Sequence, residues 1–126
     1  MNAIVYDAAI LIAADRNDRR TWAEHRARIE GSITPLVPAP VVAQVSRSTN
    51  QALLRRLLSG CIVVPMDELG AHEAGRLLAR SNTADVVDAA VVVVAVRHQA
   101  NILTGDPRVM RRLVSASGAD IAVVPV

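Results

Sequence analysis

The chain has 126 residues, of which 52% are hydrophobic and 21% charged, and this fits one domain over residues 1–126 with a substantial core. Its net charge of +2 does not by itself indicate a nucleic-acid-binding protein. All 14 basic residues are arginine, which excludes any mechanism that needs an active-site lysine.

Short apolar runs alternate along the chain with helical patterns. Strands are expected at residues 3–6, 36–37, 61–64, 102–104 and 121–124. Helices are expected at residues 8–14, 19–30, 41–58, 67–79, 84–98 and 106–116. The valines at 91–94 favour a strand, but the segment 84–98 is too long for a buried strand, so we expect a helix capped by Ser81 or Thr83.

This alternation predicts an α/β fold, with a central parallel sheet of about five short strands covered by helices on both faces. Ligands of such sheets bind beyond the carboxyl ends of the strands. Asp7 and Asp106 each follow the carboxyl end of a predicted strand. Asp88 lies in the apolar helix 84–98, with Asp85 three residues before it. We therefore expect one joint site at this edge of the sheet.

Each of these aspartates also has a purely structural explanation. Asp7 and Asp106 suit helix N-caps, Asp85 suits a first helical turn, and Asp88 could pair with a buried arginine. However, carboxylates that converge beside core hydrophobes need a positive partner. A hard divalent cation with oxygen ligands is the simplest partner, and it points to metal-assisted chemistry on phosphate.

Three segments, in their order and separations, resemble PIN-domain ribonucleases: Ile4-Val5-Tyr6-Asp7, Asp88-Ala89-Ala90 and Leu103-Thr104-Gly105-Asp106-Pro107. The resemblance spans nearly the whole chain and is greatest to the VapC toxins of bacterial toxin–antitoxin pairs. It implies a PIN-like three-layer α/β/α fold and a metal-dependent endoribonuclease. It also implies that Asp7, Asp88 and Asp106 hold Mg²⁺ or Mn²⁺, and that the Thr104 hydroxyl orients a carboxylate or a bound water.

The chain departs from the family pattern at Gln44, where that pattern places a glutamate. A glutamine can offer an oxygen to a metal, but it carries no charge and cannot act as a base. Either Asp85 supplies the missing carboxylate, or the site works with fewer ligands, or catalysis is impaired. The alternative function is therefore a catalytically weak PIN-like module that binds RNA or an antitoxin.

The resemblance further implies an RNA substrate, a VapB-like antitoxin and a homodimer. We expect the antitoxin to insert an arginine toward the acidic site, and helices 41–58 and 67–79 to form the dimer interface. The candidate phosphate contacts lie on two predicted helices: Arg47, Arg55 and Arg56 on one, and Arg108, Arg111 and Arg112 on the other.

Other classes of protein fit the sequence less well. A phospho-acceptor receiver domain or an aspartyl phosphatase also has strand-end aspartates, but both employ a lysine, and Ala9 stands where the phosphatase has its second aspartate. No apolar run is long enough to span a membrane. The single cysteine, Cys61, cannot form an internal disulfide, and no signal peptide is visible, so we expect a cytoplasmic protein.

Overall fold

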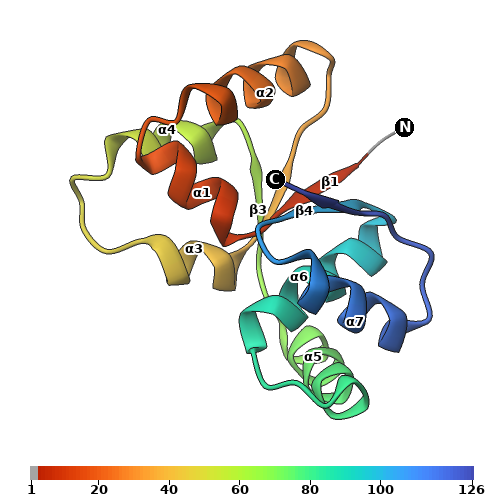
Figure 1. Cartoon of the computed structure of the whole chain (residues 1–126). Helices are drawn as coiled ribbons and strands as arrows, with labels where there is room; N and C mark the ends of the chain where they lie inside the picture. Colours follow the sequence, from red (N-terminus) through yellow and green to blue (C-terminus); the bar gives the residue numbers. More distant parts are fainter. Residues whose placement is uncertain (1–2) are drawn as a thin grey trace.

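The computed structural model describes residues 3–126, in which short strands alternate with helices (Figure 1). The strands are β1 (Ile4–Tyr6), β2 (Leu36–Pro38), β3 (Ile62–Val64), β4 (Asn101–Thr104) and β5 (Val123–Pro125). The helices are α1 (Ala8–Asp15), α2 (Arg19–Glu30), α3 (Ala39–Val45), α4 (Ala52–Ser59), α5 (Glu68–Ser81), α6 (Val86–His98) and α7 (Pro107–Ser117). All five expected strands are found, with ends that differ by at most two residues.

The described strands form one parallel sheet in the order β3-β2-β1-β4-β5. β1 lies at its centre, where Val5 pairs with Leu36 of β2 and with Ile102 of β4. Helices α1, α2 and α4 pack together on one side of the sheet, and α5, α6 and α7 pack together on the other (Figure 1). The prediction of a parallel sheet between two helical layers is confirmed.

Helix α6 shows why a valine-rich segment is helical here. Ala89 to Ala95 are all buried, and α6 contacts β1, β2 and β4 as well as α5 and α7. A helix surrounded by the core in this way needs no polar face, so apolar residues all round it are favourable. Burial outweighs the modest preference of valine for strands, and the prediction of a helix is confirmed.

The predicted helix at 41–58 is wrong, because the chain forms α3 and α4 with a loop between them. Ser, Ser, Thr and Asn stand at positions 46, 48, 49 and 50, and their short polar side chains compete with the helical backbone for hydrogen bonds. Gln51 stabilises the loop, since its Oε1 accepts hydrogen bonds from the Arg47 and Ser48 amides at 2.6 and 3.0 Å. Its Nε2 donates to the Val45 carbonyl and to the Asp15 carboxylate.

Neither Ser81 nor Thr83 caps α6, so that prediction is also wrong. Ser81 belongs to α5, and its hydroxyl lies 2.7 Å from the Thr83 hydroxyl. The N-cap is Asp85, whose carboxylate accepts hydrogen bonds from two backbone amides at once. None of the helices in residues 3–126 has the length and hydropathy needed to cross a bilayer.

Candidate active site at the carboxyl edge of the sheet

Asp7 is the innermost acidic residue of the site. It directly follows β1, caps α1 and is only 8% exposed. Its Oδ1 accepts a hydrogen bond from the Ala9 amide at 2.8 Å, and its Oδ2 accepts one from the Gly105 amide at 3.2 Å. The second bond joins the end of β1 to the end of β4, so the fold fixes the position of this carboxylate.

The segment after β4 is arranged around the same carboxylate. Thr104 is completely buried, its hydroxyl accepts a hydrogen bond from the Asp106 amide at 2.9 Å, and the same hydroxyl acts to lower the pKa of Asp7. A side chain at Gly105 would place its Cβ 2.7 Å from the Ala9 Cβ, so this close approach requires glycine. Asp106 then caps α7 by accepting a hydrogen bond from the Val109 amide. One tight turn thus places Thr104 and Asp106 beside Asp7.

The remaining two carboxylates come from the start of α6. Asp85 is exposed, and its Oδ1 accepts hydrogen bonds from the backbone amides of Val87 and Asp88. Asp88 is partly buried one turn into the helix. Its pKa is raised to about 6, first by burial and then by the negative charges of Asp85, Asp7 and Asp106. The pairing of β1 with β4 and the Gly105–Asp7 hydrogen bond place Asp7 and Asp106 together, and the effect of their charges on Asp88 puts the start of α6 in the same region. The four aspartates of this region are called here the acid edge.

The acid edge is not neutralised by the protein itself. The pKa of Asp7 is also raised, chiefly by burial, although the Thr104 hydroxyl and the two backbone amides act in the opposite direction. In residues 3–126, the cations that form ion pairs are Arg20, Arg28, His72 and Arg97, and none of them pairs with an acid-edge aspartate. The arginine pair considered for Asp88 is therefore absent from the described part of the chain.

The chemistry of the acid edge fits a hard divalent cation, because it offers only oxygen ligands and an excess of negative charge. As the described side chains stand, no three of the Asp, Glu, His and Cys residues converge closely enough to hold an ion. Asp7, Asp85 and Asp106 each direct an oxygen to a backbone amide. Metal binding would therefore require some of these carboxylates to turn toward a common point.

Gln44 differs from the aspartates in its surroundings. It lies near the end of α3, which follows β2 and packs against both α1 and α6. Its side chain is exposed and makes no hydrogen bond to the acid edge within the described residues. The structure therefore places α3 next to the two helices that begin at the site, and no hydrogen bond joins the Gln44 amide to the carboxylates among the described residues.

The family profile of the PIN domain matches residues 4–114, which is most of the chain. The chain belongs to the PIN-domain family. PIN domains are generally nucleases, and PIN nucleases typically use divalent metal ions. No protein with a curated functional description matches the sequence.

Solved structures support the same fold. The chain superposes on VapBC from Salmonella typhimurium bound to DNA with a TM-score of 0.74 and 18% identity, covering 99% of this chain and 98% of the other. It superposes on VapBC2 from Rickettsia felis, bound to a promoter DNA fragment, with a TM-score of 0.73 and 13% identity over 98% of each chain. FitAcB from Neisseria gonorrhoeae matches with a TM-score of 0.68 and 16% identity over 96% of each chain.

A second polar cluster lies outside the acid edge, and the sequence analysis missed it. The Tyr6 hydroxyl is 2.8 Å from His25 Nδ1 and accepts a hydrogen bond from Arg28 at 3.1 Å. Because the Tyr6 oxygen accepts the hydrogen bond from Arg28, its own O–H is free to donate to Nδ1 of a neutral His25. Burial raises the pKa of Tyr6 to about 12 and lowers the pKa of His25, so both groups stay neutral.

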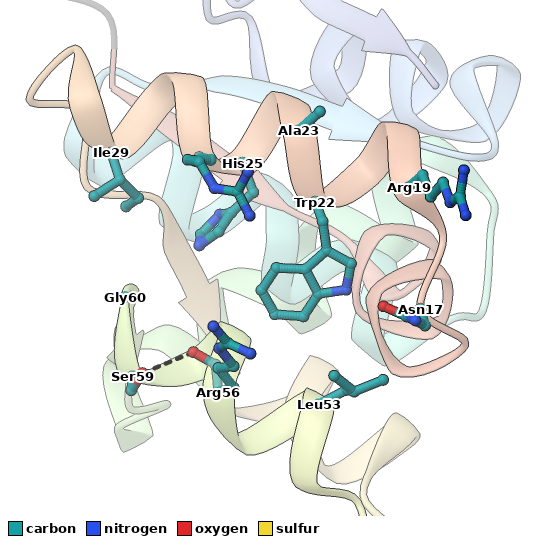
Figure 2. Close-up of a pocket in the computed structure, with 11 residues that line it drawn as sticks. Asn17, Arg19, Trp22, Ala23, His25, Ile29, Leu53, Arg56, Ser59 and Gly60 are labelled. Atoms are coloured by element: carbon teal, nitrogen blue, oxygen red, sulfur yellow. Dashed lines mark hydrogen bonds between the residues drawn. The ribbon is translucent and has the colours of Figure 1, made fainter.

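His25 also borders a hollow of about 600 Å³ between α2 and α4 (Figure 2). Trp22 forms part of its floor, and the Arg56 guanidinium lies 6.0 Å from the Trp22 ring. None of the acid-edge aspartates lines this hollow. It is therefore a separate feature of the α2 side of the molecule.

Proposed function

We propose that this PIN domain is a metal-dependent endoribonuclease and the toxin of a toxin–antitoxin pair. The observation that carries the proposal is the acid edge itself. A PIN fold holds four aspartates together, and no cation among the described residues neutralises them. Such a concentration of negative charge costs stability, and it is of use where a cation is to be bound. The matches to VapBC complexes support the toxin assignment.

In this proposal Asp7, Asp88 and Asp106 hold the metal, and Asp85 adds a fourth negative charge. Thr104 keeps the Asp7 carboxylate in one orientation through its buried hydroxyl. When bound, Mg²⁺ or Mn²⁺ supplies a Lewis acid that lowers the pKa of water and offsets the charge of the phosphodiester. The short β4–α7 turn, which Gly105 makes possible, holds Asp106 near Asp7 while the RNA is cut.

The test is cleavage of single-stranded RNA with Mg²⁺ or Mn²⁺, compared with the same protein in EDTA. We expect cleavage only with metal, and a loss of activity in Asp88→Asn and Asp106→Asn. Asp120→Asn is the matched control, because Asp120 is exposed and lies beyond α7, away from the acid edge. Full activity of Asp88→Asn would remove the nuclease assignment from this site.

A second function is favoured by one specific residue. Gln44 leaves the site one negative charge short of the family pattern, and both oxygens of Asp7 already accept backbone amides. These features favour a catalytically weak module that binds RNA or an antitoxin. Calorimetric titration with Mn²⁺ separates the two functions, since a nuclease must bind the ion at millimolar concentrations or below, whereas a binding module need not.

The proposed antitoxin is a small VapB-like protein that inserts an arginine into the acid edge. A bidentate guanidinium can neutralise carboxylates that otherwise repel one another. Antitoxin and metal should therefore compete, and antitoxin affinity should fall as Mg²⁺ rises at constant ionic strength. An affinity that does not change from zero to tens of millimolar Mg²⁺ would show that inhibition works elsewhere.

The proposed assembly is a homodimer through the predicted helices 41–58 and 67–79, which overlap α3, α4 and α5. Large apolar side chains are exposed in or just before α5, including Leu69 at 60% and, on the neighbouring edge strand β3, Ile62 at 52%. Covering them would remove apolar surface from water. Light scattering at tens of micromolar should give the mass of a dimer, and a monomer mass would contradict the proposal.

A further inference from the structure

An open groove of about 870 Å³ runs along α1, from the end of the helix next to Asp7 to its other end. Its residues are Ala9, Ile12, Ala13, Arg16, Asn17, Asp18, Arg19 and Arg20. It begins at Ala9, which binds Asp7 through its amide and touches the Gly105 turn. It ends at three arginines around the α1–α2 junction. The groove therefore connects the candidate active site to a group of cations.

Two of these arginines have no charged partner in the described part of the chain. Arg16 and Arg19 are exposed and form no ion pair within residues 3–126, whereas Arg20 bonds to Glu24 at 2.9 Å. Asp18 also lines the groove, but Thr21 donates two hydrogen bonds to its carboxylate, which keeps it at the N-cap of α2. The lining thus carries three positive charges and one negative charge.

The position of Arg19 is electrostatically unfavourable for α2. It is the first residue of the helix, no acidic residue lies in that first turn, and unlike Arg20 it has no ion pair within residues 3–126. A helix N-terminus carries partial positive charge and favours anions, so arginines there lower helix stability slightly. Local rules of this kind are broken mainly where function requires it. The same N-terminus adds to the attraction of the groove for an anion.

Three of the six arginines expected from the sequence to contact phosphate are less available. Arg47 donates to the Ala43 and Ser46 carbonyls, Arg55 donates to the Thr49 carbonyl, and Arg56 lies over the Trp22 ring. Arg19 lines both the α1 groove and the α2–α4 hollow, and its side chain points away from Trp22 and His25 (Figure 2). Arg108, Arg111 and Arg112 on α7 are exposed and form no ion pair within residues 3–126, so they remain candidates beside the arginines of the α1 groove.

We propose that the α1 groove binds the backbone of single-stranded RNA next to the scissile phosphate, an inference that rests on the proposed nuclease function. Arg16 lies two helical turns from Ala9, roughly 10 Å along the axis, so it would contact a phosphate further along the strand and not the one that is cut. Ile12, 39% exposed between them, offers apolar contact to a base or ribose. Charge complementarity and continuity with the acid edge favour RNA over an acidic peptide.

The experiment measures binding of a short fluorescein-labelled single-stranded RNA by anisotropy, with EDTA present to prevent cleavage. The test variant is Arg16→Gln with Arg19→Gln. We expect about a tenfold loss of affinity near 50 mM salt, and a slope of log K against log salt that is shallower by about 1.4, since each lost phosphate contact in a single strand removes about 0.7. Both side chains are exposed, so the variant should fold normally.

The matched control is Arg76→Gln with Arg80→Gln, which removes the same charge from exposed positions on α5, across the sheet. It should change affinity by less than about twofold, because no phosphate contact is lost. An equal loss of RNA affinity in both double variants would show that only net charge matters, and an unchanged affinity in both would show that the groove does not bind RNA. Either result would overturn the proposal. Arg19→Gln alone gives a further check, because removing a cation from a helix N-terminus should leave thermal stability equal or higher while RNA binding falls.

Two additional measurements separate this inference from its alternatives. An oligoglutamate peptide of matched charge should bind more weakly than the RNA; equal binding with the same dependence on Arg16 and Arg19 would assign the groove to an acidic peptide. Cleavage with Mg²⁺ or Mn²⁺ is measured independently. If the parent cuts RNA but the groove variant binds RNA normally, the groove proposal fails and the nuclease proposal stands. If the groove variant loses RNA binding but the parent cuts no RNA, the groove proposal stands and the nuclease proposal fails.

Discussion

Tyr6 and Asp7 are consecutive residues at the end of the central strand, yet they lie in opposite kinds of environment. The Tyr6 hydroxyl is satisfied by His25 on one side and by Arg28 on the other. The Asp7 carboxylate is held by backbone amides and the Thr104 hydroxyl, but its charged neighbours are other carboxylates. A buried polar group that is fully paired stabilises a fold, whereas unneutralised charge weakens it. This difference separates the part of the molecule that supports the fold from the part available for chemistry.

The largest expected effect concerns Asp88 at the acid edge. Asp88→Asn should lower metal-dependent RNA cleavage by about 100-fold or more, because metal charge stabilisation is worth several kcal/mol and tenfold in rate is about 1.4 kcal/mol. The same variant should be more stable than the parent in EDTA at neutral pH, since it removes a repelled carboxylate whose pKa is about 6. Because Asp88 is only partly buried and water screens its charge, the gain should be about 1 kcal/mol.

Urea denaturation measures that gain, and Asp120→Asn controls for the loss of one negative charge. If Asp88→Asn were less stable than the parent without metal, the carboxylate would be serving the fold, and the distinction between the two regions would fail. A gain in stability together with a loss of cleavage is the result typical of a residue kept for function.

Tyr6→Phe should have the opposite effect. It removes the hydroxyl that lies between His25 and Arg28, so both lose a buried partner, and the free energy of unfolding should fall by about 1 to 3 kcal/mol. RNA cleavage per folded molecule should stay close to that of the parent, because the ring still fills its place in the core. A large loss of cleavage without a loss of stability would show that the cluster acts on the acid edge.

The contrast between the two regions also explains which features the sequence reveals. Each acid-edge aspartate stands at a strand end or a helix start, where local pattern applies, and the family resemblance also covers Asp7, Asp88 and Asp106. The Tyr6 cluster joins residues 19 and 22 positions apart, and no periodicity marks such a contact. The helix expected at 41–58 failed for a related reason. Apolar residues keep helical spacing on both sides of the loop, and one of the hydrogen bonds of Gln51 reaches Asp15, 36 residues away.

Acid should affect the two regions in opposite directions. Burial, and then the charge of Arg28, lower the pKa of His25 below its ordinary value of 6.5. Its contribution to stability is therefore complete above pH 6.5 and is lost as the pH falls toward the lower pKa of the folded protein. Asp88 has a raised pKa, so its protonation stabilises the fold as the pH falls and would mask the effect of His25. The pH dependence of stability is therefore measured in the Asp88→Asn variant. The comparison is between Asp88→Asn and the double variant that also carries His25→Gln. Below pH 6.5 the melting temperature of Asp88→Asn should fall more steeply with pH than that of the double variant. Parallel curves of melting temperature against pH would exclude His25 as the cause.

The smallest expected effect comes from restoring the family's charge at Gln44. Gln44→Glu adds a carboxylate to α3, which packs against both helices that begin at the acid edge. Because the side chain is exposed, water screens its charge and the gain should not exceed about 1 kcal/mol, which corresponds to about two- to fivefold tighter Mn²⁺ binding. Arg76→Gln makes the same change in net charge on remote α5 and should leave Mn²⁺ affinity unchanged. Equal gains in both variants would show that only net charge matters. No gain in Gln44→Glu would mean that this position does not reach the metal, and that the four aspartates constitute the whole site.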